Sequence, residues 1–257
     1  MFSYRFKRKE NEMAKGIRLH VWGDYALFTR PEMKAERVSY DVMTPSAARA
    51  IVSSIYWKPE IEWVIDRIHV LKPIRFTSVR RNEVGAVAVA PRREALAGQP
   101  VEPIGLSIED ERQQRASLLL KDVGYVIEAH FNVVSPTLEK DGEKVDLAKC
   151  EAKHISMFNR RAEAGQCFRQ PYFGCREFPV SFRLLKDADP LPDKHLDVRD
   201  RDFGFMFHDF IYREDKKGTI IESHAGRKLT AEPRFFRAMM KDGVIEIPSL
   251  KGKEVLG

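Results

Sequence analysis

Apolar residues alternate with polar ones along several stretches of the first 185 residues, and this alternation predicts β-strands. The predicted strands cover residues 17–22, 61–71 with a continuation past Pro73 to about residue 81, 117–121, 124–134 and about 177–184. In the stretch 124–134, Tyr125, Ile127 and Ala129 fall on one side of the strand. Strands of this kind are typical of a sheet with one face packed on a core.

A first helix is expected to begin at Thr44-Pro45, where an N-cap residue is followed by proline at the first helical position. Its apolar stripe consists of Ala48, Ile51, Val52 and Ile55. This helix should end before Lys58-Pro59, because the residue that precedes a proline disfavours the helical region. Tyr56 is therefore expected at the C-terminal end of the helix.

A second helix is expected within residues 143–164, and Gly165 after it suits a left-handed cap. Its apolar stripe consists of Ile155, Phe158 and Ala162. If the helix starts early, Lys153 and His154 lie inside it. If it starts near Ala152, both residues lie at its N-terminus, where the helix dipole favours an anion.

The order of these elements is strand, helix, strand, strand, helix, strand. This order predicts an α+β fold with a ferredoxin-like (RRM-like) βαββαβ domain over residues 16–186. The aromatic-rich consensus by which an RNA-recognition motif binds RNA on its sheet is missing.

The remaining chain, 187–257, predicts a small C-terminal antiparallel β-sheet domain that packs on the first one. Residues 185–197 are rich in Pro and Asp and favour a linker. The expected elements are a strand over 203–212, a turn at 215–218, a returning strand over 219–222, a short helix over 233–240 and a strand over 244–247 after Asp242-Gly243.

Composition narrows the function classes. The 257 residues are 43% hydrophobic and include 16 Phe, which is enough for a folded core. The net charge of +6 is compatible with nucleic acid, although the charges are mixed in sign. Three cysteines without a CxxC pair favour a reducing cytoplasm over disulfides or a zinc site. No apolar run is long enough to cross a membrane.

Several basic residues form a candidate RNA-binding set. These residues are Arg80, Arg81, Arg160, Arg161 and Arg176. Each could equally be a solvent-facing side chain, and the loop over 82–112 could be merely mobile. Residues 1–15 begin with a basic stretch that predicts an N-terminal tail, for which contact with nucleic acid is the sharper alternative.

Six short motifs occur in the order typical of one known family. They are Gly-Asp-Tyr-Ala-Leu-Phe (23–28), Ser-Ile-Tyr-Trp-Lys-Pro (54–59), Leu-Lys-Asp-Val-Gly-Tyr (120–125), Ala-His-Phe (129–131), Lys-His-Ile-Ser-Met-Phe (153–158) and Pro-Tyr-Phe-Gly-Cys-Arg-Glu-Phe (171–178). In these motifs the chain resembles the CRISPR-associated repeat-processing endoribonuclease of the type I-C (Dvulg) subtype, a branch of the RAMP superfamily. The resemblance runs from about residue 16 to the C-terminus and is looser after 185.

This resemblance implies an enzyme that cleaves CRISPR precursor RNA within the repeat and stays on the 5′ handle of the crRNA as a subunit of type I-C Cascade. It implies catalytic roles for Tyr56, Lys153 and His154, with no metal and no cofactor. The chemistry suits these residues, because attack by a 2′-OH needs a proton acceptor near neutral pH and a cation near the phosphorane. Without the resemblance, Tyr56 is better explained as a core aromatic.

Two other function classes stay open. One is a non-catalytic subunit that only caps the crRNA. The other is a general nucleic-acid binder, with duplex DNA as a further candidate partner.

Overall fold

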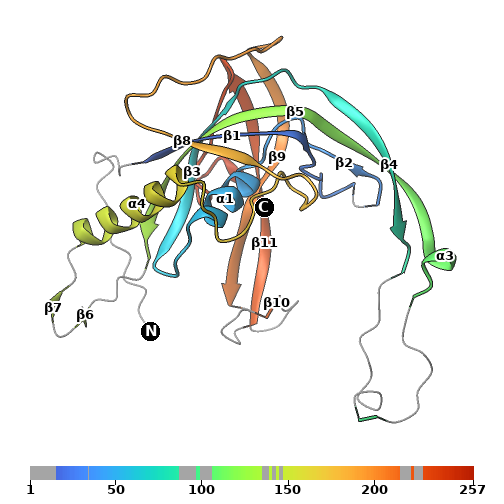
Figure 1. Cartoon of the computed structure of the whole chain (residues 1–257), viewed down its shortest axis with the longest axis horizontal. Helices are drawn as coiled ribbons and strands as arrows, with labels where there is room; N and C mark the ends of the chain where they lie inside the picture. Colours follow the sequence, from blue (N-terminus) through green and yellow to red (C-terminus); the bar gives the residue numbers. More distant parts are fainter. Residues whose placement is uncertain are drawn as a thin grey trace.

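The computed structural model describes residues 16–33, 35–86, 97–98, 106–134, 139–140, 143–144, 147–214, 221–222 and 228–257. The predicted tail over 1–15, most of the loop over 82–112 and the turn at 215–218 lie outside these residues. A twisted sheet runs across the molecule, and helices α1 and α4 lie on one side of it (Figure 1). Among the described helices, none combines the length and apolar character needed to cross a membrane.

The described elements form a mixed α and β structure whose strand pairs are almost all antiparallel. The helices are α1 (Pro45–Ile55), α3 (Ile108–Glu111) and α4 (Leu147–Glu163). The strands are β1 (Ile17–Ala26), β2 (Arg37–Val38), β3 (Ile61–Val70), β4 (Phe76–Val84), β5 (Arg112–Val133), β6 (Glu139–Lys140), β7 (Glu143–Lys144), β8 (Ser181–Leu185), β9 (Arg201–Glu214), β10 (Ile221–Glu222), β11 (Lys228–Lys241), β12 (Val244–Glu246) and β13 (Val255–Leu256).

Strand β5 is the centre of the sheet. The order β3-β5-β1-β8 is antiparallel at every step, and β4 pairs with the first half of β5 while β3 pairs with the second half. The two strands predicted at 117–121 and 124–134 are therefore one continuous strand, and that prediction was wrong. Asp122, which lies between the two predicted strands, has a φ of 51° within the continuous strand. Neighbouring strands on both sides supply the hydrogen bonds that keep the strand unbroken.

Helix α1 begins and ends as predicted. The Thr44 side chain accepts a hydrogen bond from the backbone N–H of Ala47 at 3.3 Å, and Pro45 occupies the first turn. At the other end, the backbone of Tyr56 becomes extended while its N–H still donates to the carbonyl of Val52. The apolar stripe of the helix is buried in the core.

Helix α4 begins at Leu147, so Lys153 and His154 lie inside it and not at its N-terminus. Phe158 and Ala162 are buried, which confirms the predicted stripe facing the sheet. Gly165 follows with a φ of 65°, the left-handed conformation expected of a helix cap.

The C-terminal part of the chain contains β11 where a helix was predicted over 233–240, and that prediction was wrong. Phe236, Ala238 and Met240 are buried while Arg237 and Met239 are exposed. This period of two residues is the pattern of a strand. Long antiparallel pairing with β9 supplies the backbone hydrogen bonds. The predicted returning strand is also different, because Ile221–Glu222 pairs with β11 and not with β9.

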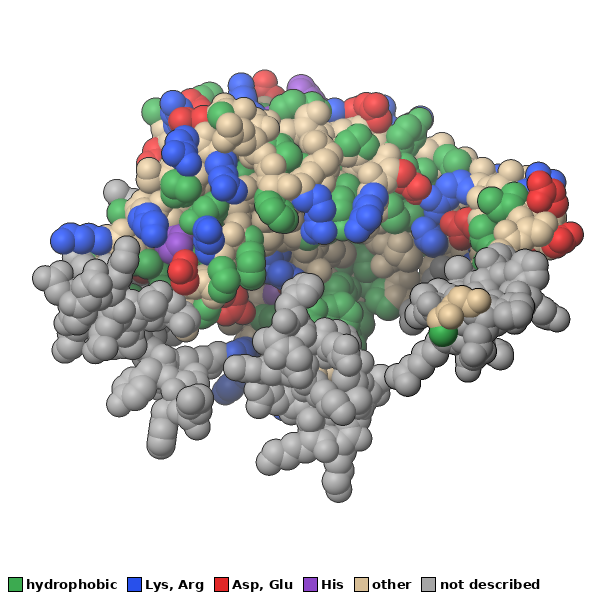
Figure 2. All heavy atoms as spheres, turned by 60° about the horizontal axis from the view of Figure 1, so that its bottom comes forward, with side chains coloured by type: hydrophobic (Ala, Val, Ile, Leu, Met, Phe, Trp, Pro, Cys, Tyr) green, Lys and Arg blue, Asp and Glu red, His purple; other side chains and the backbone are tan. Residues whose placement is uncertain are grey.

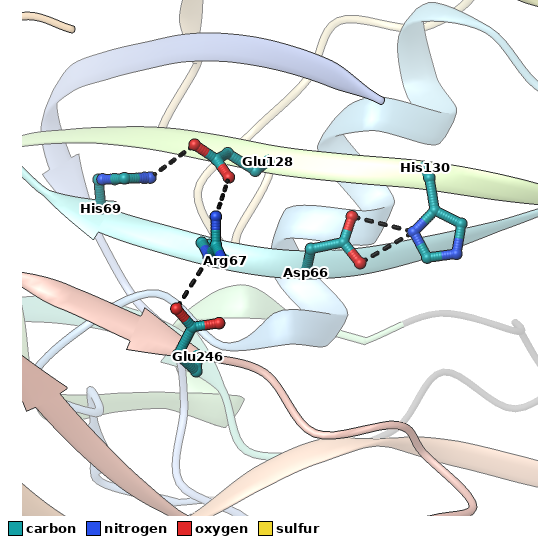
Figure 3. A network of polar contacts seen from close by, with 6 residues as sticks. All are labelled: Asp66, Arg67, His69, Glu128, His130 and Glu246. Carbon is teal, nitrogen blue, oxygen red and sulfur yellow. Dashed lines mark hydrogen bonds and ion pairs between the residues drawn. The ribbon is translucent and has the colours of Figure 1, made fainter. Parts of the chain in front are cut away.

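Strand β12 lies between β11 and β3, so the C-terminal strands continue the same sheet. It follows the turn at Asp242-Gly243, where φ is 47° and 72°, and it pairs with β3. Arg67 of β3 lies between two carboxylates, Glu128 of β5 at 3.3 Å and Glu246 of β12 at 2.8 Å (Figure 3). The division into domains at residue 187 stays a prediction.

Candidate active site

The fold brings Tyr56 and His154 together although they are 98 residues apart. The hydroxyl of Tyr56 and Nδ1 of His154 are 2.8 Å apart, a hydrogen-bond distance. Tyr56 is placed by the end of α1 and by Trp63 of β3, whose indole N–H donates to the Tyr56 carbonyl at 2.9 Å. His154 projects from the middle of α4 toward the same point.

Both side chains are packed inside the protein. The exposed fraction of Tyr56 is 1% and that of His154 is 2%. The ring of Phe131 meets the imidazole edge-on, with 5.9 Å between centroids. The guanidinium of Arg161 lies 5.4 Å from the centroid of the Tyr56 ring. The two polar groups therefore have fixed positions and a surrounding that contains little water.

The surroundings lower the pKa of His154. Burial is the largest cause, because it disfavours the imidazolium. The carboxylate of Glu60 acts in the opposite direction, and the ammonium groups of Lys153 and Lys58 lower the pKa further. With a pKa below its ordinary value of 6.5, His154 is neutral at pH 7 and can accept a proton.

The pKa of Tyr56 is raised, first by burial and then by the carboxylate of Glu60, while Arg161 opposes the shift. At neutral pH the phenol therefore keeps its proton. The pair consists of a neutral phenol and a neutral imidazole that share one hydrogen bond.

Glu60 lies near the second ring nitrogen of His154. Its Oε2 lies 3.7 Å from Nε2 of His154, on the side of the ring opposite Tyr56. A carboxylate at this place favours the tautomer protonated on Nε2. Nδ1 is then an acceptor, and the Tyr56 hydroxyl donates to it. The Glu60 side chain is 39% exposed, so solvent reaches this side of the pair.

Lys153 does not point where His154 points. Consecutive residues of a helix are turned by about 100°, and here Lys153 is exposed while His154 is buried. The positive charge of Lys153 is nevertheless close enough to lower the pKa of His154 further, after the larger effect of burial. Lys153 therefore lies on the surface that borders the buried pair.

The predicted RNA-binding arginines differ in their surroundings. Arg160 is exposed, whereas Arg161 donates to the carbonyl of Ile55 at 3.3 Å and covers Tyr56. Arg80 is exposed on β4, and its neighbour Arg81 is held in a network of protein groups. The partners of Arg81 are Glu83, Ser117 and Glu177.

Arg176 is exposed beside Glu177, and β4 lies at the opposite end of the sheet from α4 (Figure 1). The Lys and Arg side chains on the face seen in Figure 2 are spread out with acidic ones among them. The arginines therefore do not form one block around Tyr56 and His154.

Two residues next to the pair were missed by the sequence analysis. Glu60 directly follows the motif 54–59, and Trp63 belongs to the alternating pattern of β3, so neither had a signal of its own. His130 of β5 and Asp66 of β3 form a second histidine–carboxylate pair, with 2.8 Å between Nδ1 and Oδ1 (Figure 3). Asp66 is the chain neighbour of Arg67. Among the described residues, no group of three or more His, Cys, Asp or Glu is arranged to hold a metal ion.

Comparison with known proteins gives consistent matches over nearly the whole chain. The family model described as "CRISPR-associated protein (Cas_Cas5)" matches residues 16–248. The chain is 51% identical over 246 residues to the CRISPR pre-crRNA endoribonuclease Cas5d of Mannheimia succiniciproducens, covering 95% of this chain and 99% of that relative. It is 37% identical over 243 residues to the protein of the same name from Thermus thermophilus, covering 93% and 94%.

A solved crystal structure of a CRISPR-associated protein matches with a TM-score of 0.59 at 23% identity. The match covers 95% of this chain and 97% of that chain. It shows similarity of fold.

Proposed function

Because this chain belongs to the Cas5 family of CRISPR-associated proteins, we propose that it is an endoribonuclease that cleaves CRISPR precursor RNA within the repeat. The comparisons confirm the family that the six motifs indicated. Two relatives named as pre-crRNA endoribonucleases match more than nine-tenths of the chain, and this supports the proposed activity.

The hydrogen bond between Tyr56 and His154 is the observation that carries the proposal. The 2′-OH of the nucleotide upstream of the cut gives its proton to the Tyr56 oxygen while the Tyr56 proton moves to Nδ1 of His154. The 2′-oxygen then attacks the adjacent phosphorus, the bond from phosphorus to the 5′-oxygen of the next nucleotide breaks, and that oxygen takes a proton from water. His154 afterwards returns its extra proton to solvent. Lys153, exposed beside the pair, stabilises the charge that develops on the phosphorane. The lowered pKa of His154 suits a base and not an acid at neutral pH.

The RNA approaches from the side of Glu60, where Lys58 and Lys153 lie at the surface. Since Tyr56 is 1% exposed, part of this border must move when the RNA binds. In the proposed reaction no metal and no cofactor takes part. Arg80, Arg160 and Arg176 are exposed and remain candidates for phosphate contacts, and Arg81 and Arg161 would need to exchange a protein partner for RNA.

The proposal also includes a ferredoxin-like arrangement of the strands and helices in the first part of the chain. The antiparallel order β3-β5-β1-β8, with α1 and α4 between the strands in sequence, supports a ferredoxin-like βαββαβ domain. After cleavage the protein stays on the 5′ handle of the crRNA as a subunit of type I-C Cascade. A crRNA-capping subunit without activity and a binder of duplex DNA are the alternatives, and both predict that repeat RNA stays intact in the test below.

The test uses labelled repeat RNA and the same RNA with one 2′-deoxy nucleotide just upstream of the cut. The first substrate should give an upstream fragment with a 2′,3′-cyclic phosphate and a downstream fragment with a 5′-hydroxyl. The second should bind and stay intact, because it lacks the nucleophile. Cleavage of the deoxy substrate at the normal rate would reject the mechanism, and no cleavage of either substrate would reject the activity.

A further inference from the structure

A cavity of about 340 Å³ reaches the C-terminal end of α1, where Trp57, the chain neighbour of Tyr56, belongs to its lining. Its walls come from α1, from β3, from β9 and from the loop after β12. Three aromatic side chains of its lining are partly or largely exposed: Trp57 at 58%, Tyr212 at 54% and Phe210 at 39%. This volume lies at the lower end of the range for ligand sites, about 300–1,000 Å³, so it suits one small planar group and not a folded RNA stem.

The edge of β3 forms the floor of this cavity. Five consecutive residues, Ile61 to Ile65, line it. Alternate side chains of a strand point to opposite faces, so five in a row can line one cavity only along the edge of the strand. On this edge β12 pairs only with Arg67 to His69. An unpaired strand edge presents backbone N–H and C=O groups, which are donors and acceptors of the kind that base edges use.

Two residues of the cavity lining, Trp57 and Trp63, adjoin the backbone of Tyr56. Trp57 follows Tyr56 in the chain, and the two side chains differ in direction, since Tyr56 is buried and Trp57 is exposed. Trp63 belongs to the cavity lining and also donates to the carbonyl of Tyr56. The cavity wall and the proposed catalytic hydroxyl are thus carried by neighbouring residues at the end of α1.

The charges that line the cavity cancel one another. Arg49 is bound to Asp209 through both carboxylate oxygens, with 2.9 Å for one of the two contacts. The other charged lining residues are Glu62 and Lys251, one of each sign. A wall without net charge suits a neutral group, whereas phosphates would stay outside near Lys58.

On this basis we infer that the cavity binds a single unpaired nucleobase of the repeat RNA, next to the scissile phosphate, by stacking on Trp57 and Tyr212 of its lining. The inference rests on the proposed function, and it assigns substrate recognition to residues outside the catalytic pair. Base stacking on aromatic side chains supplies about 1–3 kcal/mol per base. Loss of one stacking partner should therefore weaken binding about tenfold.

The test is an abasic scan of the uncleavable 2′-deoxy repeat RNA. Affinity is measured for the unchanged chain, Trp57→Ala, Tyr212→Ala and the control Phe205→Ala, whose aromatic side chain is 57% exposed on β9 outside the cavity. For the unchanged chain, one abasic position beside the cut should weaken binding about tenfold. Trp57→Ala and Tyr212→Ala should each weaken binding of intact RNA similarly and lose their sensitivity to that position. Phe205→Ala should keep both properties.

The inference is overturned if both cavity variants bind intact RNA as the unchanged chain does, or if they remain fully sensitive to every abasic position. The second result would assign the cavity to another occupant, such as a segment of a partner protein. Cleavage of ordinary repeat RNA by the unchanged chain is measured in parallel. If that cleavage occurs while the cavity variants and the unchanged chain respond alike to every abasic position, the inference about the cavity fails and the proposed activity stands.

Discussion

If Tyr56 and His154 act as one proton relay, removing either should cost as much as removing both. The perturbations are Tyr56→Phe, which deletes only the hydroxyl, His154→Ala, and the double variant. The ring of Tyr56 and its contact with Arg161 stay in place in Tyr56→Phe. The hydrogen bond of 2.8 Å is the contact that both single variants break.

The expected magnitudes follow from the role of each group. Loss of a general base typically lowers the rate by at least about a hundredfold, or about 2.7 kcal/mol of activation free energy. Two independent groups would give a loss of about 10,000-fold in the double variant. Residues that act as a unit are strongly non-additive, so we expect the double variant to stay near a hundredfold.

A stability cost must be separated from the catalytic one. Tyr56→Phe leaves Nδ1 of His154, which is 2% exposed, without its partner. An unsatisfied buried group costs about 1–3 kcal/mol, which for a chain of this size lowers Tm by roughly 2–12 °C. Tyr125→Phe is the matched control, because Tyr125 is 3% exposed and its hydroxyl bonds the backbone of Met43. It should lose similar stability and keep full cleavage.

The assay is single-turnover cleavage of labelled repeat RNA with the protein in excess, so that the rate reports the chemical step. RNA affinity and cleavage are measured at a temperature below the unfolding transition of every variant. The Tm of each variant is measured separately. Full activity of Tyr56→Phe or of His154→Ala would contradict the relay. A loss near 10,000-fold in the double variant would show two separate roles. A rate loss of the same size in Tyr125→Phe would show that lower stability, and not the missing relay, causes the slower cleavage.

Two further predictions concern metal ions and pH. Cleavage should continue in excess EDTA, and loss of activity that magnesium restores would bring the carboxylates back as metal ligands. The folded-state pKa values of four histidines are lowered, at His20, His69, His154 and His208. Their contribution to stability is therefore complete above pH 6.5 and declines as the pH falls toward the folded-state values, by at most about 1.4 kcal/mol per pH unit for each histidine. Urea unfolding at pH 5.5 and 7.5 should show a smaller difference for His154→Gln than for the unchanged chain. An unchanged difference in His154→Gln would contradict the lowered pKa of His154.

Local signals in the chain were enough to predict several elements. Thr44-Pro45 and the stripe that follows specified α1, because a cap, a proline and a helical period agree within eleven residues. Gly165 marked the end of α4 for the same local reason. The prediction failed at β11, which is a strand because β9 pairs along it, and whose Phe236, Ala238 and Met240 are buried because this face packs on the core. That partner is distant in the chain and leaves no local trace.

The candidate site divides in the same way. The sequence by itself determined that Tyr56 ends a helix, that His154 is next to Lys153, and, through the motifs, which family the chain belongs to. Only the tertiary structure decided that the phenol and the imidazole share a hydrogen bond, that Glu60 faces Nε2, and that the imidazole is buried enough to stay neutral. A pKa and a tautomer depend on distances between groups and on the exclusion of water. Both are properties of packing between α1, α4 and the sheet, and the order of residues along the chain does not specify them one by one.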